Sequence, residues 1–213
     1  MSGLKLRAAA AAAIVLAGMT ISPATAATEP PRPAFYEAPA NLPAGNGTVI
    51  RSEALSYLLD PAQANQVAFN SQRVLYTSTN RTGKRIAVSG TVMVPKSPWV
   101  GLGRRPVIGY AVGTQGMADK CAPSRQFSDG LEYEGLFIQG LLMRGYAIAM
   151  TDYEGLGTAG IHTYMDRVSQ GRAVLDMVRA AEKLSGTGLS SLSPVGIQGY
   201  SQGGGAAAAA VEL

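Results

Sequence analysis

The sequence predicts an α/β fold in which a mostly parallel sheet with flanking helices follows an N-terminal antiparallel hairpin. Its second half alternates short apolar runs at 107–112, 146–150 and 195–197 with segments of helical spacing at 132–144 and 169–184. Strands that alternate with helices form right-handed βαβ units, so the three runs should lie parallel in one sheet.

The hairpin is predicted from two β-rich runs, at 73–79 and 86–94. They are separated by Asn80-Arg81-Thr82-Gly83-Lys84, whose Asn and Gly suit a turn.

Both predicted helices carry apolar side chains at helical spacing, and each is followed by a glycine, Gly145 or Gly186, of the kind that ends a helix. The apolar positions are Leu136, Leu141 and Leu142 in the first helix, and Val174, Leu175, Val178, Ala181 and Leu184 in the second.

The N-terminus has the pattern of a secretory signal. Lys5 and Arg7 precede an apolar run from Ala8 to about Met19 that is too short to span a bilayer, and small residues at 22–26 favour cleavage after Ala26 or Ala27. We therefore expect a signal peptide at 1–26, export from the cell and no stable membrane insertion.

The segment after the signal is rich in proline, since Pro23 and residues 29–47 together hold six of the 12 prolines. We interpret 27–48 as an extended arm lying over the domain, and 49–213 as the N-terminal part of that domain. The net charge of +4 includes Lys5 and Arg7. The remaining excess is too small and too scattered to indicate a nucleic-acid partner.

The strongest chemical motif is Gly199-Tyr200-Ser201-Gln202-Gly203, which directly follows the last predicted strand and opens a helix rich in glycine and alanine. This succession is typical of the nucleophile elbow of α/β-hydrolases. The turn is strained, and glycines two residues before and after the serine leave room for a neighbouring strand and helix. Ser201 is therefore the candidate nucleophile.

An ester hydrolase also needs two backbone N–H donors for the oxyanion, one of them from the residue after the nucleophile. Gln202 would supply this donor. The loop 113–116, after the strand 107–112, would supply the second, with Gln115 as the candidate, although a plain solvent loop is an equal interpretation.

The general base is missing from the expected position, because in α/β-hydrolases the acid and the histidine follow the serine. The one histidine, His162, precedes it. We interpret His162 as a structural histidine, with pocket lining as the first alternative and the base role as the least favoured. Tyr200 is a second candidate for lining a pocket. Asp152 and Glu154 lie at the same sheet edge, but we expect them to pair locally.

Two further features of the sequence are a glycine-rich pattern at 155–160 and a single cysteine. Residues 155–160 fit G-x-G-x-x-G, the dinucleotide fingerprint, but they do not directly follow a strand and lack the acid about 20 residues further on. We therefore expect no cofactor and no metal. Cys121 is the only cysteine. It is either a buried free thiol or half of a disulfide whose partner lies elsewhere.

The chain from about Phe35 onward resembles the secretory lipase family of fungal and actinobacterial triacylglycerol lipases. The resemblance is carried by residues 73–76, 86–95, 113–124, 151–157 and 199–205, with Cys121-Ala122-Pro123-Ser124 and Asp152-Tyr153-Glu154-Gly155 the most specific. It implies an α/β-hydrolase fold, a lipid or small ester as substrate, no cofactor, and oxyanion donors at Gln115 and Gln202. It also favours a disulfide partner for Cys121 beyond residue 213.

The resemblance further implies a longer protein, with a helical lid and the catalytic acid and histidine after residue 213. We therefore expect this chain to be a truncated ester hydrolase, inactive and poorly soluble as given. The alternatives are a short-chain esterase or acyltransferase that uses the same serine, and a non-catalytic fragment.

Overall fold

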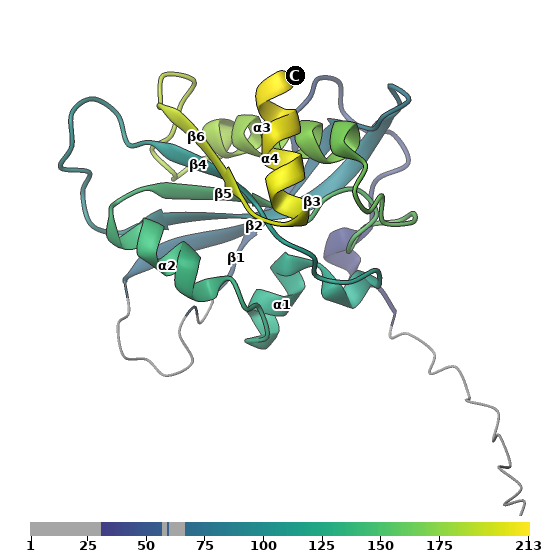
Figure 1. Ribbon diagram of the computed structural model, residues 1–213, viewed down its shortest axis with the longest axis horizontal. Helices are drawn as coiled ribbons and strands as arrows, with labels where there is room; N and C mark the ends of the chain where they lie inside the picture. The colour runs from purple at the N-terminus through teal and green to yellow at the C-terminus, as the bar shows by residue number, and fades with distance from the viewer. Residues whose placement is uncertain (1–30, 57–58, 60–66) are drawn as a thin grey trace, which may run out of the picture. The chain divides into compact units, whose positions relative to one another are not determined.

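The structure is a computed structural model that describes residues 31–56, 59 and 67–213. The predicted signal peptide lies outside these residues. Within them, six strands form one sheet in the order β1-β2-β3-β5-β4-β6 (Figure 1). The strands are β1 (Val49–Ala54), β2 (Phe69–Thr79), β3 (Arg85–Pro95), β4 (Val107–Ala111), β5 (Ala147–Thr151) and β6 (Val195–Gly199).

Helices cover both faces of the sheet, as predicted for an α/β fold (Figure 1). Helices α3 and α4 lie on one face, where they pack against each other and against β4, and α1 and α2 lie on the other face. The described helices are α1 (Pro123–Asp129), α2 (Gly135–Met143), α3 (Arg167–Lys183) and α4 (Gln202–Glu212), with short 3₁₀ helices η1 (Ala34–Tyr36) and η2 (Asp119–Cys121).

The parallel part of the sheet consists of β4, β5 and β6, with β4 in the middle. Ala111 at the end of β4 pairs with Thr151 of β5 and with Gly199 of β6, so all three carboxyl ends meet at one edge. Ligands of α/β sheets bind at this edge. The predicted strands and their parallel direction are confirmed.

The antiparallel part is larger than the predicted hairpin. β2 and β3 form that hairpin, β3 continues antiparallel to β5, and β1 adds an edge strand on β2. The described sheet is therefore mixed rather than mostly parallel. β1 was missed because its exposed half has no alternation of apolar and polar residues.

The core lies on both faces of the sheet, and α3 covers one of them. The predicted apolar face of α3 is buried at Val174, Val178, Ala181 and Leu184, with Leu175 half-buried. This stripe packs closely on β4, since a Cβ at Gly109 would lie 3.0 Å from Cγ2 of Val178 and 3.2 Å from Cγ1 of Val174. Burial of an aliphatic side chain stabilises by roughly 1.5–3 kcal/mol, so this face fixes α3 on the sheet.

The prediction for α2 was wrong in one residue. Leu136 is 63% exposed, whereas Ile138 and Leu142 are buried. At 100° per residue, Leu136 lies about 160° around the helix from Ile138, so the two cannot face the sheet together. The helix begins at Gly135 rather than at Glu132.

The described residues of the Pro-rich arm pack against the domain through Tyr36, which is fully buried. The Tyr36 hydroxyl lies 2.8 Å from the Ser124 hydroxyl, and Arg73 donates to it at 3.1 Å. The arm also contains η1, which its proline content did not predict.

Candidate active site

Ser201 occupies a strained turn between β6 and α4. β6 ends at Gly199 and α4 begins at Gln202. The serine has φ 54° and ψ −125°, a conformation that is costly for a residue with a side chain. Its side chain is exposed at the carboxyl edge of the parallel strands.

Both flanking glycines of the motif are required by close backbone approach. A Cβ atom at Gly203 would lie 2.0 Å from the Ala111 carbonyl oxygen, and one at Gly199 would lie 2.4 Å from the Gly203 carbonyl oxygen. Real Cβ contacts are not this short, so neither position accepts a side chain without a shift of the backbone.

The loop after β4 reaches the same site. A Cβ atom at Gly113 would lie 3.1 Å from Cζ of Tyr200, the residue before the serine. Both polar atoms of the Gln115 side-chain amide are hydrogen bonded: Nε2 donates to Glu132 (3.2 Å), and Oε1 accepts from Gln126 (3.2 Å). Gln202 is the first residue of α4, where a backbone N–H has no acceptor within the helix.

Two glutamates that were not predicted as site residues, Glu132 and Glu134, accept hydrogen bonds from this loop. The Gly113 N–H donates to Oε1 of buried Glu134 at 2.6 Å, and burial raises the pKa of Glu134. Burial also raises the pKa of Glu132 to about 7. In the sequence these residues are only two acids at the start of a predicted helix. Acids at such positions more often face solvent, so the sequence did not indicate a site role.

His162 lies beside the elbow with both ring nitrogens engaged. Nδ1 lies 3.0 Å from the Glu154 carbonyl oxygen, and Nε2 lies 3.2 Å from Nε2 of Gln202. The residue is 4% exposed, and burial lowers its pKa. It is therefore a neutral, hydrogen-bonded histidine next to the candidate oxyanion donor.

Glu154 pairs locally, as expected, whereas the partners of Asp152 lie far from it in the sequence. Fully buried Asp152 accepts from the Ser89 hydroxyl (2.6 Å) and the Ser124 backbone N–H (2.9 Å). Glu154 accepts from the hydroxyls of Thr163 and Ser169. These bonds tie the β5–α3 loop to β3, α1 and α3.

Exposed aromatic side chains lie around Tyr200, the residue before Ser201. Tyr200 is 48% exposed, and its ring centroid lies 6.5 Å from that of exposed Phe137. Tyr133 donates from its hydroxyl to the Thr114 carbonyl oxygen at 3.2 Å. Tyr200, a predicted pocket-lining residue, thus lies next to exposed Phe137, and its role in lining a pocket stays a prediction.

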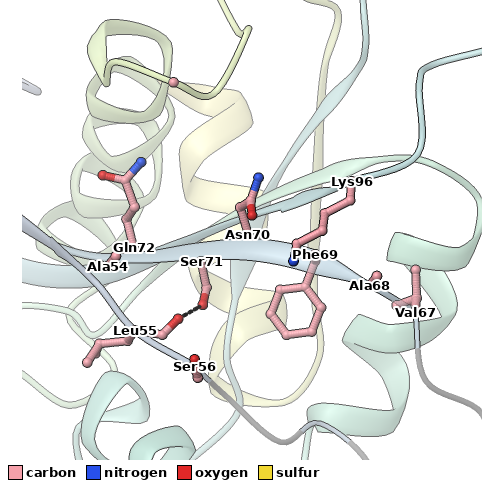
Figure 2. A pocket seen from close by; sticks show the side chains of 11 residues that line it. Ala54, Leu55, Ser56, Val67, Ala68, Phe69, Asn70, Ser71, Gln72 and Lys96 are labelled. Atoms are coloured by element: carbon pink, nitrogen blue, oxygen red, sulfur yellow. Dashed lines mark hydrogen bonds between the residues drawn. The ribbon is translucent and has the colours of Figure 1, made fainter.

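A cavity of about 570 Å³ lies at the other edge of the sheet. It is bordered by Phe69 of β2, by Lys96 just after β3 and by Gly186 (Figure 2). β3 reaches this edge after Met93, which pairs with Ile148 near the amino end of β5. The cavity is therefore separate from Ser201.

The remaining sequence candidates show no binding geometry in the described part of the chain. The glycines at 155, 157 and 160 form turns, and α3 begins only at Arg167. Cys121 is a half-buried free thiol in η2. No group of three potential metal-ligating side chains occurs among the described residues, and no helix among them has the length and apolarity to cross a membrane.

Comparison with known proteins gave consistent matches. The family profile described as secretory lipase matches residues 124–213. A Mycobacterium tuberculosis protein named a probable inactive lipase is 33% identical over 84% of this chain and 40% of its own length. A secreted triacylglycerol lipase of Malassezia globosa is 28% identical over 79% of this chain and 36% of its own.

Among solved structures, Candida antarctica lipase A in its closed state superposes with a TM-score of 0.70 and 28% identity. The match covers 86% of this chain and 43% of that one. The chain thus spans about two-fifths of the length of the proteins it matches.

Proposed function

We propose, from the premise that the chain belongs to the secretory lipase family, that Ser201 is the nucleophile of a carboxylic ester hydrolase. The substrate would be a lipid or a simpler ester. The observation that carries the proposal is the left-handed backbone of Ser201 between β6 and α4, with glycines fitted on both sides.

In the proposed reaction, Ser201 Oγ attacks the carbonyl carbon of the ester. The backbone N–H groups of Gln202 and Gln115 stabilise the negative charge that develops on the carbonyl oxygen. Collapse of the tetrahedral intermediate releases the alcohol and leaves the acyl group on Oγ, and water then hydrolyses this acyl-enzyme.

The proton of Ser201 must pass to a general base, and we do not assign this role to His162. Both of its ring nitrogens are already hydrogen bonded, and it is the only histidine of the 213 residues. We therefore propose that these residues by themselves turn esters over very slowly. The relative named a probable inactive lipase accords with this proposal.

The test is covalent labelling of the full chain with a fluorophosphonate, which accumulates product even when the serine reacts slowly. We expect one phosphonyl group per chain, on Ser201, and none in Ser201→Ala. The matched control is Ser191→Ala, at an exposed serine in the loop before β6. Labelling that survives Ser201→Ala would exclude Ser201 as the nucleophile.

We also propose that the protein is exported. The proposal rests on the basic and apolar pattern of residues 1–26 and on the secreted relative from Malassezia globosa. Expression in a bacterial host should release a protein whose N-terminus is Ala27 or Thr28. Intact Met1 on protein retained in the cytoplasm would contradict export.

A further inference from the structure

The hydrogen bonds of His162 admit only one arrangement of protons. The carbonyl oxygen of Glu154 can only accept, so Nδ1 of His162 carries the hydrogen. In a neutral imidazole Nε2 is then an acceptor, and its partner must be a donor. The amide nitrogen of Gln202, 3.2 Å from Nε2, is that donor.

The imidazole is fixed on its other sides as well. Its ring stacks with that of Tyr153, with centroids 6.2 Å apart and an angle of 30° between the planes, and it also contacts the ring of Tyr164. The Tyr153 hydroxyl donates to the Val112 carbonyl oxygen at the end of β4 (2.9 Å). The histidine is therefore held by the β5–α3 loop and anchored to β4.

The first turn of α4 packs on the backbone at the end of β4 through Gly203, but side chains contribute little to holding it. Gln202 is followed by Gly203, Gly204 and Gly205, and glycine weakens a helix through its backbone entropy. Ser201 makes no side-chain cap hydrogen bond. Gln202 is also the only residue of α4 before Val211 with a side chain larger than methyl.

We propose that His162 is a positioning residue that holds the buried side chain of Gln202, and thereby fixes the first turn of α4 and the oxyanion-binding N–H of Gln202. This inference rests on the proposed role of Ser201. It gives the neutral histidine a function in ester hydrolysis that is distinct from proton transfer.

The first experiment tests the contact without requiring activity. Because His162 is the only histidine of the chain, labelling with ¹⁵N-histidine gives the NMR signals of one imidazole. At neutral pH we expect the form protonated at Nδ1. Gln202→Met, which removes the donor, should shift the Nε2 signal, whereas the control Gln198→Met, at an exposed residue of β6, should not. A hydrogen on Nε2, or no response to Gln202→Met, would overturn the proposal.

The second experiment tests the consequence at Ser201. Loss of an oxyanion donor slows acyl transfer about a hundredfold or more, so a donor that is only loosened should slow it about tenfold. We expect His162→Leu to slow phosphonylation of Ser201 about tenfold. His162→Gln should restore most of the rate, because a glutamine can accept the hydrogen bond of Gln202 but cannot act as a base.

The outcomes separate the two proposals. Absence of Ser201 labelling in the unaltered chain would reject the proposed function, while the NMR experiment would still decide the contact. Wild-type labelling rates in a folded His162→Leu variant would reject the positioning role. Failure of a folded His162→Gln to recover any rate would also reject it, in favour of proton transfer by the histidine.

Discussion

At the scale of single residues, the strain at Ser201 is maintained by its neighbours. A residue in this backbone region costs about 1–3 kcal/mol, which the surrounding structure must offset. Here the offset comes from close packing of the turn on the end of β4, where Gly203 lies against the backbone of Ala111. Gly203 of the motif and Gly205, which lies beyond it in α4, thus differ in what they contribute, and this difference can be measured.

Gly203→Ala should destabilise the fold by about 3 kcal/mol or more, because its Cβ would meet the Ala111 carbonyl oxygen at 2.0 Å. The matched control is Gly205→Ala, two residues further along α4, where a Cβ would meet nothing within 4 Å. There alanine should stabilise by about 0.5–1 kcal/mol. Urea unfolding of both variants decides the point, and equal midpoints would contradict this account of the elbow.

Glu132 should make stability depend on pH. Burial raises its pKa from 4.5 to about 7, so folding takes up a proton in this range and the free energy of unfolding falls as pH rises through it. Glu132→Gln keeps an oxygen acceptor for Gln115 and for the Glu134 N–H. Between acidic and mildly basic pH, the free energy of unfolding of Glu132→Gln should rise by about 3 kcal/mol relative to that of the wild type. Parallel unfolding curves against pH for the two proteins would refute this.

The sequence predicted the residues of the elbow but not the contacts that support it. The glycines around Ser201 are adjacent in the chain, so their pattern is visible locally. The bond from Gly113 to Glu134 spans 21 residues, and the bond from Gln202 to His162 spans 40. Each depends on how a loop folds back onto the sheet edge, which apolar periodicity does not encode.

At the scale of elements, the sequence predicted those with a strong apolar pattern and missed those without one. β4, β5 and α3 are apolar on the face that they bury, and β6 begins with a short apolar run. All four were predicted to within a few residues. β1 and α1 are partly exposed and have no regular apolar pattern, so tertiary contacts decide their structure. The α3 helix also has a defined start, since Asp166 accepts from the N–H groups of Val168 and Ser169 at 3.2 Å each.

Asp166→Ala should therefore destabilise the fold by about 1 kcal/mol through loss of this N-cap. Asp166→Asn, which keeps the acceptor, should lie within a few tenths of a kcal/mol of wild type. The ion pair of Asp166 with Arg81 adds little, because the two atoms are 3.8 Å apart and Arg81 is largely exposed. Thermal melts of both variants test the cap, and a loss as large in the asparagine variant would implicate the charge instead.

At the scale of the whole molecule, the fold brings the candidate site residues to one edge of the sheet. The loop after β4 carries Gln115, the loop after β5 carries His162, and the turn after β6 carries Ser201. These loops meet because β4 lies between β5 and β6 with their carboxyl ends aligned. Of the groups that ester hydrolysis requires, the nucleophile and the oxyanion donors have candidates at this edge, whereas the one histidine there is bound to Gln202.

Ester turnover by the full chain should therefore be close to that of Ser201→Ala, measured with p-nitrophenyl butyrate. Without a general base the serine reacts slowly, and the catalysis that remains comes from binding and oxyanion stabilisation. The decisive comparison adds His162→Gln, which cannot transfer a proton. If the chain instead shows strong Ser201-dependent turnover that His162→Gln abolishes, His162 must leave Gln202 during the reaction and act as the base. The free chain would then differ from the catalytic state in the first turn of α4.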